Sequence, residues 1–183
     1  MAFQWRTRGR AHLLGDNFPH DGGVITQQMV QSRSTDPAEL IPHLFENHDT
    51  TLISRMKPGD FVVAGRNFGC GKPHISGFLA MQAFGLRVLA ESVPVPVARA
   101  MMNLGLPCLQ PCRGLRDLVS EGDEIEVDFS SGQVIHLATG RELSFRALDP
   151  FVRNTIEQGG LKGALLHWLK EHPELGEPAE TRA

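Results

Sequence analysis

The chain has 183 residues, which suits one domain, and its 41% hydrophobic and 21% charged residues are ordinary for a globular protein. The formal net charge of −3 gives no electrostatic basis for nucleic-acid binding, and the odd number of cysteines, 3, argues against a disulfide framework. No apolar run approaches the roughly 20 residues of a membrane helix and residues 1–10 lack a signal-peptide core, so we expect a cytoplasmic protein.

The first part of the chain predicts a loop followed by a helix. Residues 15–25 are rich in Gly, Pro, Asp and Asn, which is typical of a loop that leads into a short apolar run. Thr35 is the expected N-cap and Pro37 the expected first residue of a helix that ends near residue 47.

Strands and helices then alternate. The apolar run Phe61 to Ala64 follows a Lys-Pro-Gly-Asp turn, which predicts a strand buried on both faces. Further along, the sequence predicts a helix, a strand, a second helix and a short strand, over residues 75–84, 86–90, 95–104 and 107–109. This succession indicates parallel strands joined by right-handed crossovers.

The C-terminal part predicts antiparallel strands and a long helix. Apolar alternation over residues 124–129, a turn, and a return over residues 134–137 predict a hairpin. A helix is expected over residues 150–171, with an interruption at Gly159-Gly160.

The predicted fold class is α/β, with a small parallel sheet and its helices followed by an antiparallel hairpin. We expect a single domain over residues 1–172. Residues 173–183 are rich in Glu and Pro and are expected to form a mobile tail.

A glycine-rich segment, Gly65 to Gly71, lies between the predicted buried strand and the next helix. Its glycines would let N–H groups face a pocket or solvent, and with Lys72 and His74 they predict a site for carboxylate or phosphate. A tight turn without a ligand is the alternative. The segment is not a Walker A loop, because Pro73 follows the lysine, nor a dinucleotide fingerprint, because His74 replaces the third glycine.

Several motifs occur in the order found in one enzyme family. They are Gly15-Asp16-Asn17, Asn67-Phe68-Gly69-Cys70-Gly71, Ala90-Glu91-Ser92, Asn103-Leu104-Gly105-Leu106-Pro107 and Gly159-Gly160-Leu161. From about residue 15 to residue 169 the chain resembles the small subunit of isopropylmalate dehydratase and homoaconitase, in the aconitase family.

This resemblance implies the swivelling β/β/α fold of the last aconitase domain. It also implies a large-subunit partner, in a heterodimer or heterotetramer, that holds a [4Fe-4S] cluster through its own cysteines. The implied reaction is that of a hydro-lyase: the complex removes water from a hydroxy di- or tricarboxylate and can add it back at the neighbouring carbon.

The chain departs from the family pattern at residues that carry its chemistry. After Gly-Cys-Gly the family reads Ser-Ser-Arg-Glu, in which the first serine is the catalytic base and the arginine clamps a substrate carboxylate. In this chain the same places hold Lys72, Pro73, His74 and Ile75. His20 stands before Asp21 where the family has threonine, and the family's Ser-Phe-Ala-Arg is here Ser92-Val93-Pro94-Val95.

We expect Lys72 or His74 to be the catalytic base, with Lys72 first because it occupies the place of the serine. The alternative is that both are solvated loop residues. Arg33 lies in the loop where relatives carry substrate-selecting residues, and is either a carboxylate clamp or a surface arginine. The other predicted substrate-binding residues are Gly69, Cys70, Gly71 and Arg99, the last at the place of a family arginine. Cys70 is expected to be a small buried thiol rather than a metal or redox group.

No metal site is predicted in this chain, because Cys108, Cys112 and the loosely spaced histidines do not make a four-ligand set. Three functions remain open. The first is the small subunit of an iron–sulfur hydro-lyase. The second is a binding or regulatory module that keeps the swivelling fold without catalysis, and a stand-alone anion-binding protein is a third alternative.

Overall fold

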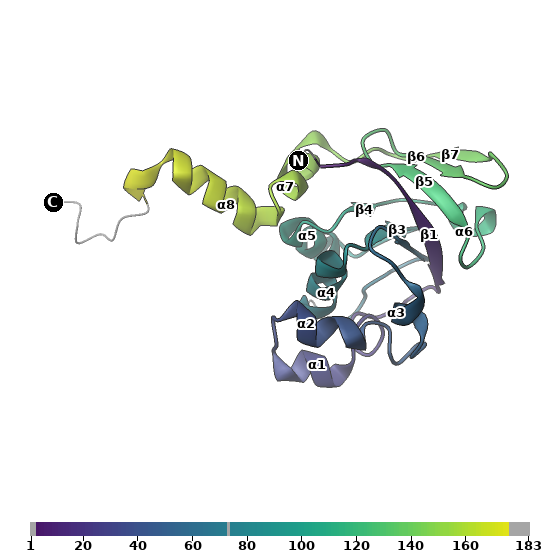
Figure 1. The fold of residues 1–183 in the computed structure, drawn as a ribbon, viewed down its shortest axis with the longest axis horizontal. Coiled ribbons are helices and arrows are strands. Elements are labelled where there is room, and N and C mark those ends of the chain that lie inside the picture. The colour runs from purple at the N-terminus through teal and green to yellow at the C-terminus, as the bar shows by residue number, and fades with distance from the viewer. Residues whose placement is uncertain (1–2, 73, 176–183) are drawn as a thin grey trace.

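The structure is a computed structural model that describes residues 3–72 and 74–175. Its strands are β1 (Arg6–Leu14), β2 (Phe61–Ala64), β3 (Arg87–Ala90), β4 (Cys108–Leu109), β5 (Glu124–Asp128), β6 (Gln133–His136) and β7 (Glu142–Ser144). They form one seven-stranded sheet in the order β4-β3-β2-β1-β5-β6-β7 (Figure 1). β1 to β4 are parallel, whereas β5, β6 and β7 extend the sheet antiparallel from the other side of β1.

β1 joins the two halves of this sheet. Its residues 11–14 pair in parallel with β2, and its residues 6–10 pair antiparallel with β5. No strand is predicted there from the sequence, although exposed arginines alternate along it with less exposed residues, the pattern of a half-buried strand. Glu126 on β5 binds two of these arginines, at 2.7 Å to Arg6 Nε and 2.5 Å to Arg8 Nε.

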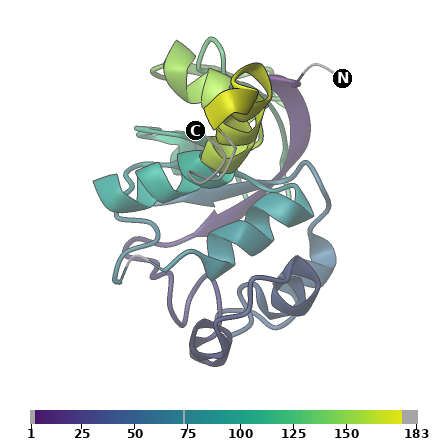
Figure 2. The ribbon, with the colours of Figure 1, turned by 90° about the vertical axis from the view of Figure 1, so that its left-hand side faces the viewer.

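The helices connect and cover the strands. They are α1 (Gln27–Ser32), α2 (Pro37–Leu40), the 3₁₀ turn η1 (Ile41–His43), α3 (Leu52–Arg55), α4 (Ser76–Phe84), α5 (Val95–Leu104), α6 (Leu115–Leu118), α7 (Pro150–Glu157), α8 (Gly160–Glu171) and the 3₁₀ turn η2 (Pro173–Leu175). α4 follows β2 and α5 follows β3, and both lie on the same face of the parallel strands (Figure 2). The predicted strand–helix crossovers are therefore confirmed.

Two hydrophobic clusters lie on opposite faces of the parallel strands. Val62 and Ala64 of β2 pack in the cluster that contains residues of α4 and α5. Phe61 and Val63 pack in the other, with residues of β5 and α6. All four residues of β2 are buried, so the prediction of a strand buried on both faces is confirmed.

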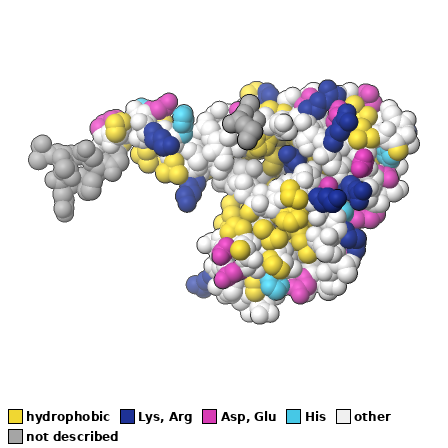
Figure 3. All heavy atoms as spheres, in the orientation of Figure 1, with side chains coloured by type: hydrophobic (Ala, Val, Ile, Leu, Met, Phe, Trp, Pro, Cys, Tyr) yellow, Lys and Arg dark blue, Asp and Glu magenta, His cyan; other side chains and the backbone are white. Residues whose placement is uncertain are grey.

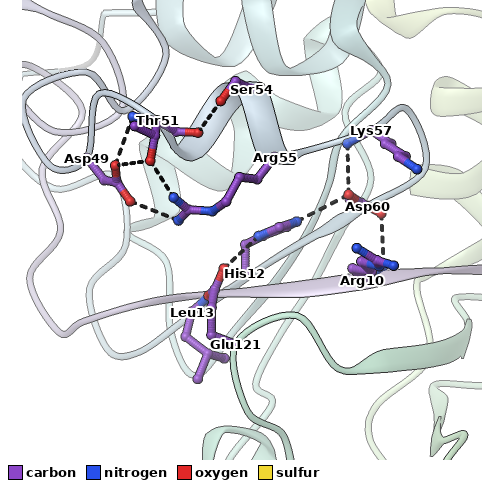
Figure 4. Close-up of polar contacts among 10 residues, drawn as sticks. All are labelled: Arg10, His12, Leu13, Asp49, Thr51, Ser54, Arg55, Lys57, Asp60 and Glu121. Atoms are coloured by element: carbon purple, nitrogen blue, oxygen red, sulfur yellow. Dashed lines mark hydrogen bonds and ion pairs between the residues drawn. The ribbon is translucent and has the colours of Figure 1, made fainter.

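A buried polar network holds β1 against the turn before β2 (Figure 4). His12 is 3% exposed, and its Nε2 lies 3.2 Å from Asp60 Oδ2 while its Nδ1 lies 2.8 Å from Glu121 Oε1. Asp60 also accepts the backbone N–H groups of Arg10 and Lys57, both at 2.8 Å. Buried polar groups need such partners, and here they fix the approach of three chain segments.

The helix predicted after Thr35 is shorter than expected. α2 ends at Leu40 and continues only as the single turn η1. The reason is Pro42, which has no N–H to donate to the carbonyl four residues earlier. The N-cap is Asp36 rather than Thr35, because the Asp36 side chain accepts the Ala38 N–H at 2.9 Å.

The predicted C-terminal hairpin and the predicted interruption of the last helix agree with the structure. β5 and β6 form the predicted hairpin. Gly159, with a φ of 81°, separates α7 from α8 and is the predicted interruption. The predicted mobile tail starts with η2, and its residues 176–183 lie outside the described residues.

α8 extends away from the rest of the chain (Figure 1). Its side chains Leu161, Leu165 and Trp168 are 57%, 53% and 44% exposed, at the spacing of one helix face. Figure 3 shows hydrophobic side chains gathered along this helix. Among the described residues, no helix is both long enough and apolar enough to cross a bilayer.

Candidate active site

Two loops leave the same edge of the sheet, because β1 and β2 are parallel neighbours. Asp16, after β1, accepts the backbone N–H of Arg66, after β2, at 2.9 Å, and its other oxygen accepts from Arg66 Nη2 at 2.7 Å. These bonds, the backbone one first, hold the pKa of Asp16 below its usual range. Asn67 Nδ2 also donates to Asn17 Oδ1 at 2.9 Å. Two segments that stand out as sequence motifs therefore form one unit.

The glycine-rich segment packs against its own chain. Each N–H from Gly65 to Gly69 has an acceptor, in chain order Leu14 O, Asp16 Oδ1, Ser92 Oγ, Ser92 O and Phe18 O. For Gly65 to Gly69, the prediction that these N–H groups face a pocket or solvent is therefore wrong. Gly69 has a φ of 73°, and a Cβ there would lie 2.8 Å from Phe78 Cζ, so close packing requires this glycine.

Three titratable side chains meet beside this segment. Asp21 Oδ1 lies 2.7 Å from His20 Nδ1, and Asp21 Oδ2 lies 2.7 Å from His74 Nδ1. The side chain of His20 is 0% exposed, that of Asp21 17% and that of His74 43%. His74 is therefore the member of this group that a molecule outside the chain can reach.

The neighbours of His20 decide where its proton lies. Gly77, near the start of α4, donates its N–H to His20 Nε2 at 3.1 Å, so this nitrogen carries no proton. His20 Nδ1 therefore carries the proton of the neutral ring and donates it to Asp21. Burial lowers the pKa of His20, in agreement with a neutral ring.

The position of the proton on His20 also determines whether this group can bind a metal ion. The ligand atoms of His20, Asp21 and His74 lie within 4.8 Å of one another, a spacing that would suit a metal ion. A metal ligand needs a free lone pair on the ring nitrogen. In this arrangement His20 Nδ1 holds a proton and His20 Nε2 accepts the Gly77 N–H, so His20 does not fit a metal site.

A pocket of about 160 Å³ adjoins His74. Its apolar lining residues include Val30, Ile75 and Leu79, and its polar ones include Arg33, His74 and Ser76. Arg33 is the C-cap of α1, with a φ of 56°. Two residues predicted from the sequence, Arg33 and His74, are thus brought to one pocket. An arginine, an imidazole and an apolar wall suit a small carboxylate with an apolar substituent.

The other predicted site residues lie elsewhere or make few contacts. Lys72 is exposed, and its side chain has no partner among the described residues. Cys70 is half-buried, and its Sγ donates to Asn17 O at 3.4 Å. Arg99 lines a different pocket, of about 260 Å³, which shares no lining residue with the pocket at His74. Their roles, and that of Gly71, stay predictions.

The environments of Cys108 and Cys112 disfavour iron–sulfur ligation by these two residues. Cluster ligands are thiolates. Burial raises the pKa of Cys108 to about 12 and raises that of Cys112 as well, which disfavours the thiolate form at both residues. Cys70, the third cysteine, offers a single ligand and cannot bind a cluster by itself.

The comparisons with known proteins give a consistent result. No family model matches the chain. The 3-isopropylmalate dehydratase small subunit of Thermodesulfovibrio yellowstonii is 35% identical over 167 residues, which cover 91% of this chain and 95% of the relative. The chain belongs to the family of 3-isopropylmalate dehydratase small subunits.

Other members of the 3-isopropylmalate dehydratase small-subunit family are similar to this chain to the same extent. Small subunit 1 of Methanopyrus kandleri is 37% identical and covers 84% of this chain and 89% of the relative. The isopropylmalate/citramalate isomerase small subunit of Methanocaldococcus jannaschii is 34% identical, with 84% and 90% covered. The crystal structure of 3-isopropylmalate dehydratase from that organism has a TM-score of 0.82 and 27% identity, over 92% of this chain and 98% of that chain. The predicted family and the α/β fold class are thereby confirmed.

Within the 3-isopropylmalate dehydratase small-subunit family, two departures of this chain meet at one residue. His20 and His74, which the sequence resemblance places where the family has threonine and arginine, both bind the carboxylate of Asp21. Asp21 is not among the site residues predicted from the sequence, although it is one of the residues that carry the resemblance to the family. The available signal is the unusual histidine that precedes it.

Proposed function

We propose that this chain is the small subunit of an isopropylmalate dehydratase-type hydro-lyase, which acts on a hydroxy di- or tricarboxylate together with a large subunit. The observation that carries this proposal is the identity of 30% to 37% with 3-isopropylmalate dehydratase small subunits over 84% or more of the chain. Relatives named as dehydratase or isomerase subunits do not favour a non-catalytic module.

The pocket at His74 supports a carboxylate substrate. Arg33 offers the fork of donors that suits a carboxylate, and Val30, Ile75 and Leu79 offer an apolar wall for a hydrocarbon substituent. Lys72 and His74 are the candidate proton acceptors, because they stand at or beside the place of the family's serine. Cys70, Gly71 and Arg99 are proposed to contact the substrate in the assembled complex, whereas the N–H of Gly69, the other predicted residue, is already bound to Phe18 O.

The proposed partner is a large subunit that carries the [4Fe-4S] cluster. When bound, the cluster supplies a Lewis acid at the substrate hydroxyl. The burial that raises the pKa of Cys108 and of Cys112 disfavours thiolates there, which supports cluster ligands outside this chain. The exposed apolar face of α8 supports a protein partner, because a 12-residue helix is marginally stable in water without packing.

The test is reconstitution without oxygen. The chain and the large subunit of the same organism are combined, and formation of the unsaturated acid is followed with isopropylmalate, citramalate and related hydroxy acids. We expect turnover of at least one of them by the complex and none by either subunit alone.

Arg33→Ala should raise KM by roughly 10-fold or more and Arg33→Lys by less, because the carboxylate fork is lost or weakened. A surface arginine variant, Arg113→Ala, is the control. A complex that has an intact cluster but turns over no hydroxy acid would support the non-catalytic module instead.

A further inference from the structure

The contacts of Asp21 distinguish between the two candidate bases. Its two carboxylate oxygens have separate partners, His20 Nδ1 and His74 Nδ1, each at 2.7 Å. Lys72 has no such partner among the described residues. Of the two candidate bases, His74 is held by a hydrogen bond to Asp21 and Lys72 is not held by any partner among the described residues.

The chain of hydrogen bonds has a defined direction. It begins at the Gly77 N–H, which donates to His20 Nε2, and His20 Nδ1–H then donates to Asp21 Oδ1. Partial burial works against ionisation of Asp21, but the hydrogen bonds from the two histidines outweigh it and lower its pKa. An ionised Asp21 has only acceptors, so its second oxygen requires a proton on His74 Nδ1.

This requirement selects one tautomer of neutral His74. With the proton on Nδ1, the lone pair lies on Nε2, which is the arrangement that a histidine general base needs. His74 is 43% exposed and lines the pocket that also holds Arg33. The basic nitrogen is thus the one that the carboxylate does not occupy.

We infer that His74 is the proton acceptor of the dehydration, with Asp21 and the buried His20 as the residues that position it. The inference rests on the proposed function. In the reaction, the C–H bond next to the substrate carboxylate breaks, its proton passes to His74 Nε2, and its electron pair forms the new double bond. The hydroxyl leaves with the C–O electron pair, and the proton from His74 completes the water.

Both unusual histidines follow from this arrangement. His74 supplies the base that the missing serine supplied, and His20 fills the buried position between Asp21 and the start of α4. A threonine side chain at residue 20 lacks the two separated nitrogens with which His20 contacts both Asp21 and the Gly77 N–H. The two departures from the family pattern therefore serve one purpose, which is to supply and position a histidine base.

Activity of the reconstituted complex tests the assignment. His74→Ala should lower kcat by roughly 10²–10⁴-fold, the usual contribution of a general base, whereas Lys72→Ala should change kcat by less than about 3-fold. Asp21→Asn should lower kcat by at least about 10²-fold with little change in KM, because the amide can donate to His74 and reverse its tautomer. A larger kcat loss in Lys72→Ala than in His74→Ala would overturn the inference.

A second measurement does not depend on turnover. Nitrogen-15 NMR of the isolated full chain reports which ring nitrogen of each histidine carries the proton. We expect the Nδ1–H tautomer for His20 and His74 in the wild type and the loss of this tautomer at His74 in Asp21→Asn. An Nε2–H tautomer for His74 in the wild type would refute the positioning role. If no wild-type complex turns over while the NMR result holds, the proposed function fails and the hydrogen-bond chain stands.

Discussion

Replacing His20 by leucine perturbs the most deeply buried polar contact of the site. His20 is 0% exposed, and its Nε2 accepts the Gly77 N–H at 3.1 Å. The first N–H groups of a helix have no acceptor within the helix, and the N-cap of α4, Ile75, has no side-chain hydrogen bond to offer. Leucine fills most of the same space but accepts no hydrogen bond. The buried N–H then has no partner, which costs about 1–3 kcal/mol of the free energy of unfolding.

Thermal unfolding followed by circular dichroism measures this loss. For a chain of this length, 1 kcal/mol corresponds to about 2–4 °C, so the Tm of His20→Leu should fall by roughly 2–12 °C. His20→Gln is the matched control, because its amide oxygen can accept the Gly77 N–H, and it should lose less. A His20→Leu variant with the Tm of the wild type would refute the assigned role of His20 at the start of α4.

The pH dependence of stability gives an independent check on the same residue. Burial lowers the pKa of His20 in the folded chain from 6.5, and the opposing hydrogen bond to Asp21 does not restore it. The unfolded chain therefore binds the proton more readily. The contribution of neutral His20 is fully present above about pH 6.5 and is lost as the pH falls below that value towards the folded pKa. His20→Leu should flatten this part of the stability curve, and an unchanged slope would contradict the neutral assignment.

Three further outcomes follow from the exposed helix, the loop contact and the cysteines. Leu165→Glu, at a side chain 53% exposed, should change the free energy of unfolding by less than about 0.5 kcal/mol yet abolish co-elution with the large subunit. His167→Glu makes the same charge change on the polar side of α8, where the side chain is 64% exposed, and should co-elute normally. Gly65→Ala should cost about 1–3 kcal/mol in urea unfolding, because its Cβ would overlap Asp16 Oδ1, and wild-type stability would contradict the tight loop contact. The purified single chain should contain no stoichiometric iron or sulfide by chemical analysis.

Local sequence patterns predict the parallel half of the sheet well. The wholly apolar residues 61–64 can be buried only as a strand covered on both faces, and the turn before them marks where it starts. Local patterns fail where a single residue overrides them. Pro42 ends α2 early, although the start signals of that helix are strong.

The sequence does not predict β1, and the reason is different. Its half-buried residues alternate with arginines, and the strand is stabilised by two partners that come later in the chain, β2 and β5. Alternation is a weak signal when one face is charged, because the carboxylate that compensates Arg6 and Arg8 lies at Glu126. Strand pairing over such separations depends on tertiary structure rather than on local preference.

The sequence by itself determines the family, the strand–helix succession and the short region between Gly65 and His74 where the resemblance implies a departure from the family's catalytic motif. These features rest on local preferences and on motif order, which need no knowledge of distant contacts. Only the tertiary structure decides what the replacements do. The N–H groups of Gly65 to Gly69 are bound by acceptors elsewhere in the chain, and Asp21, 53 residues before His74, binds that histidine while Lys72 stays exposed. The physical reason is that parallel strands bring the loops after β1 and β2 to one edge of the sheet, where their side chains complete one another's hydrogen bonds.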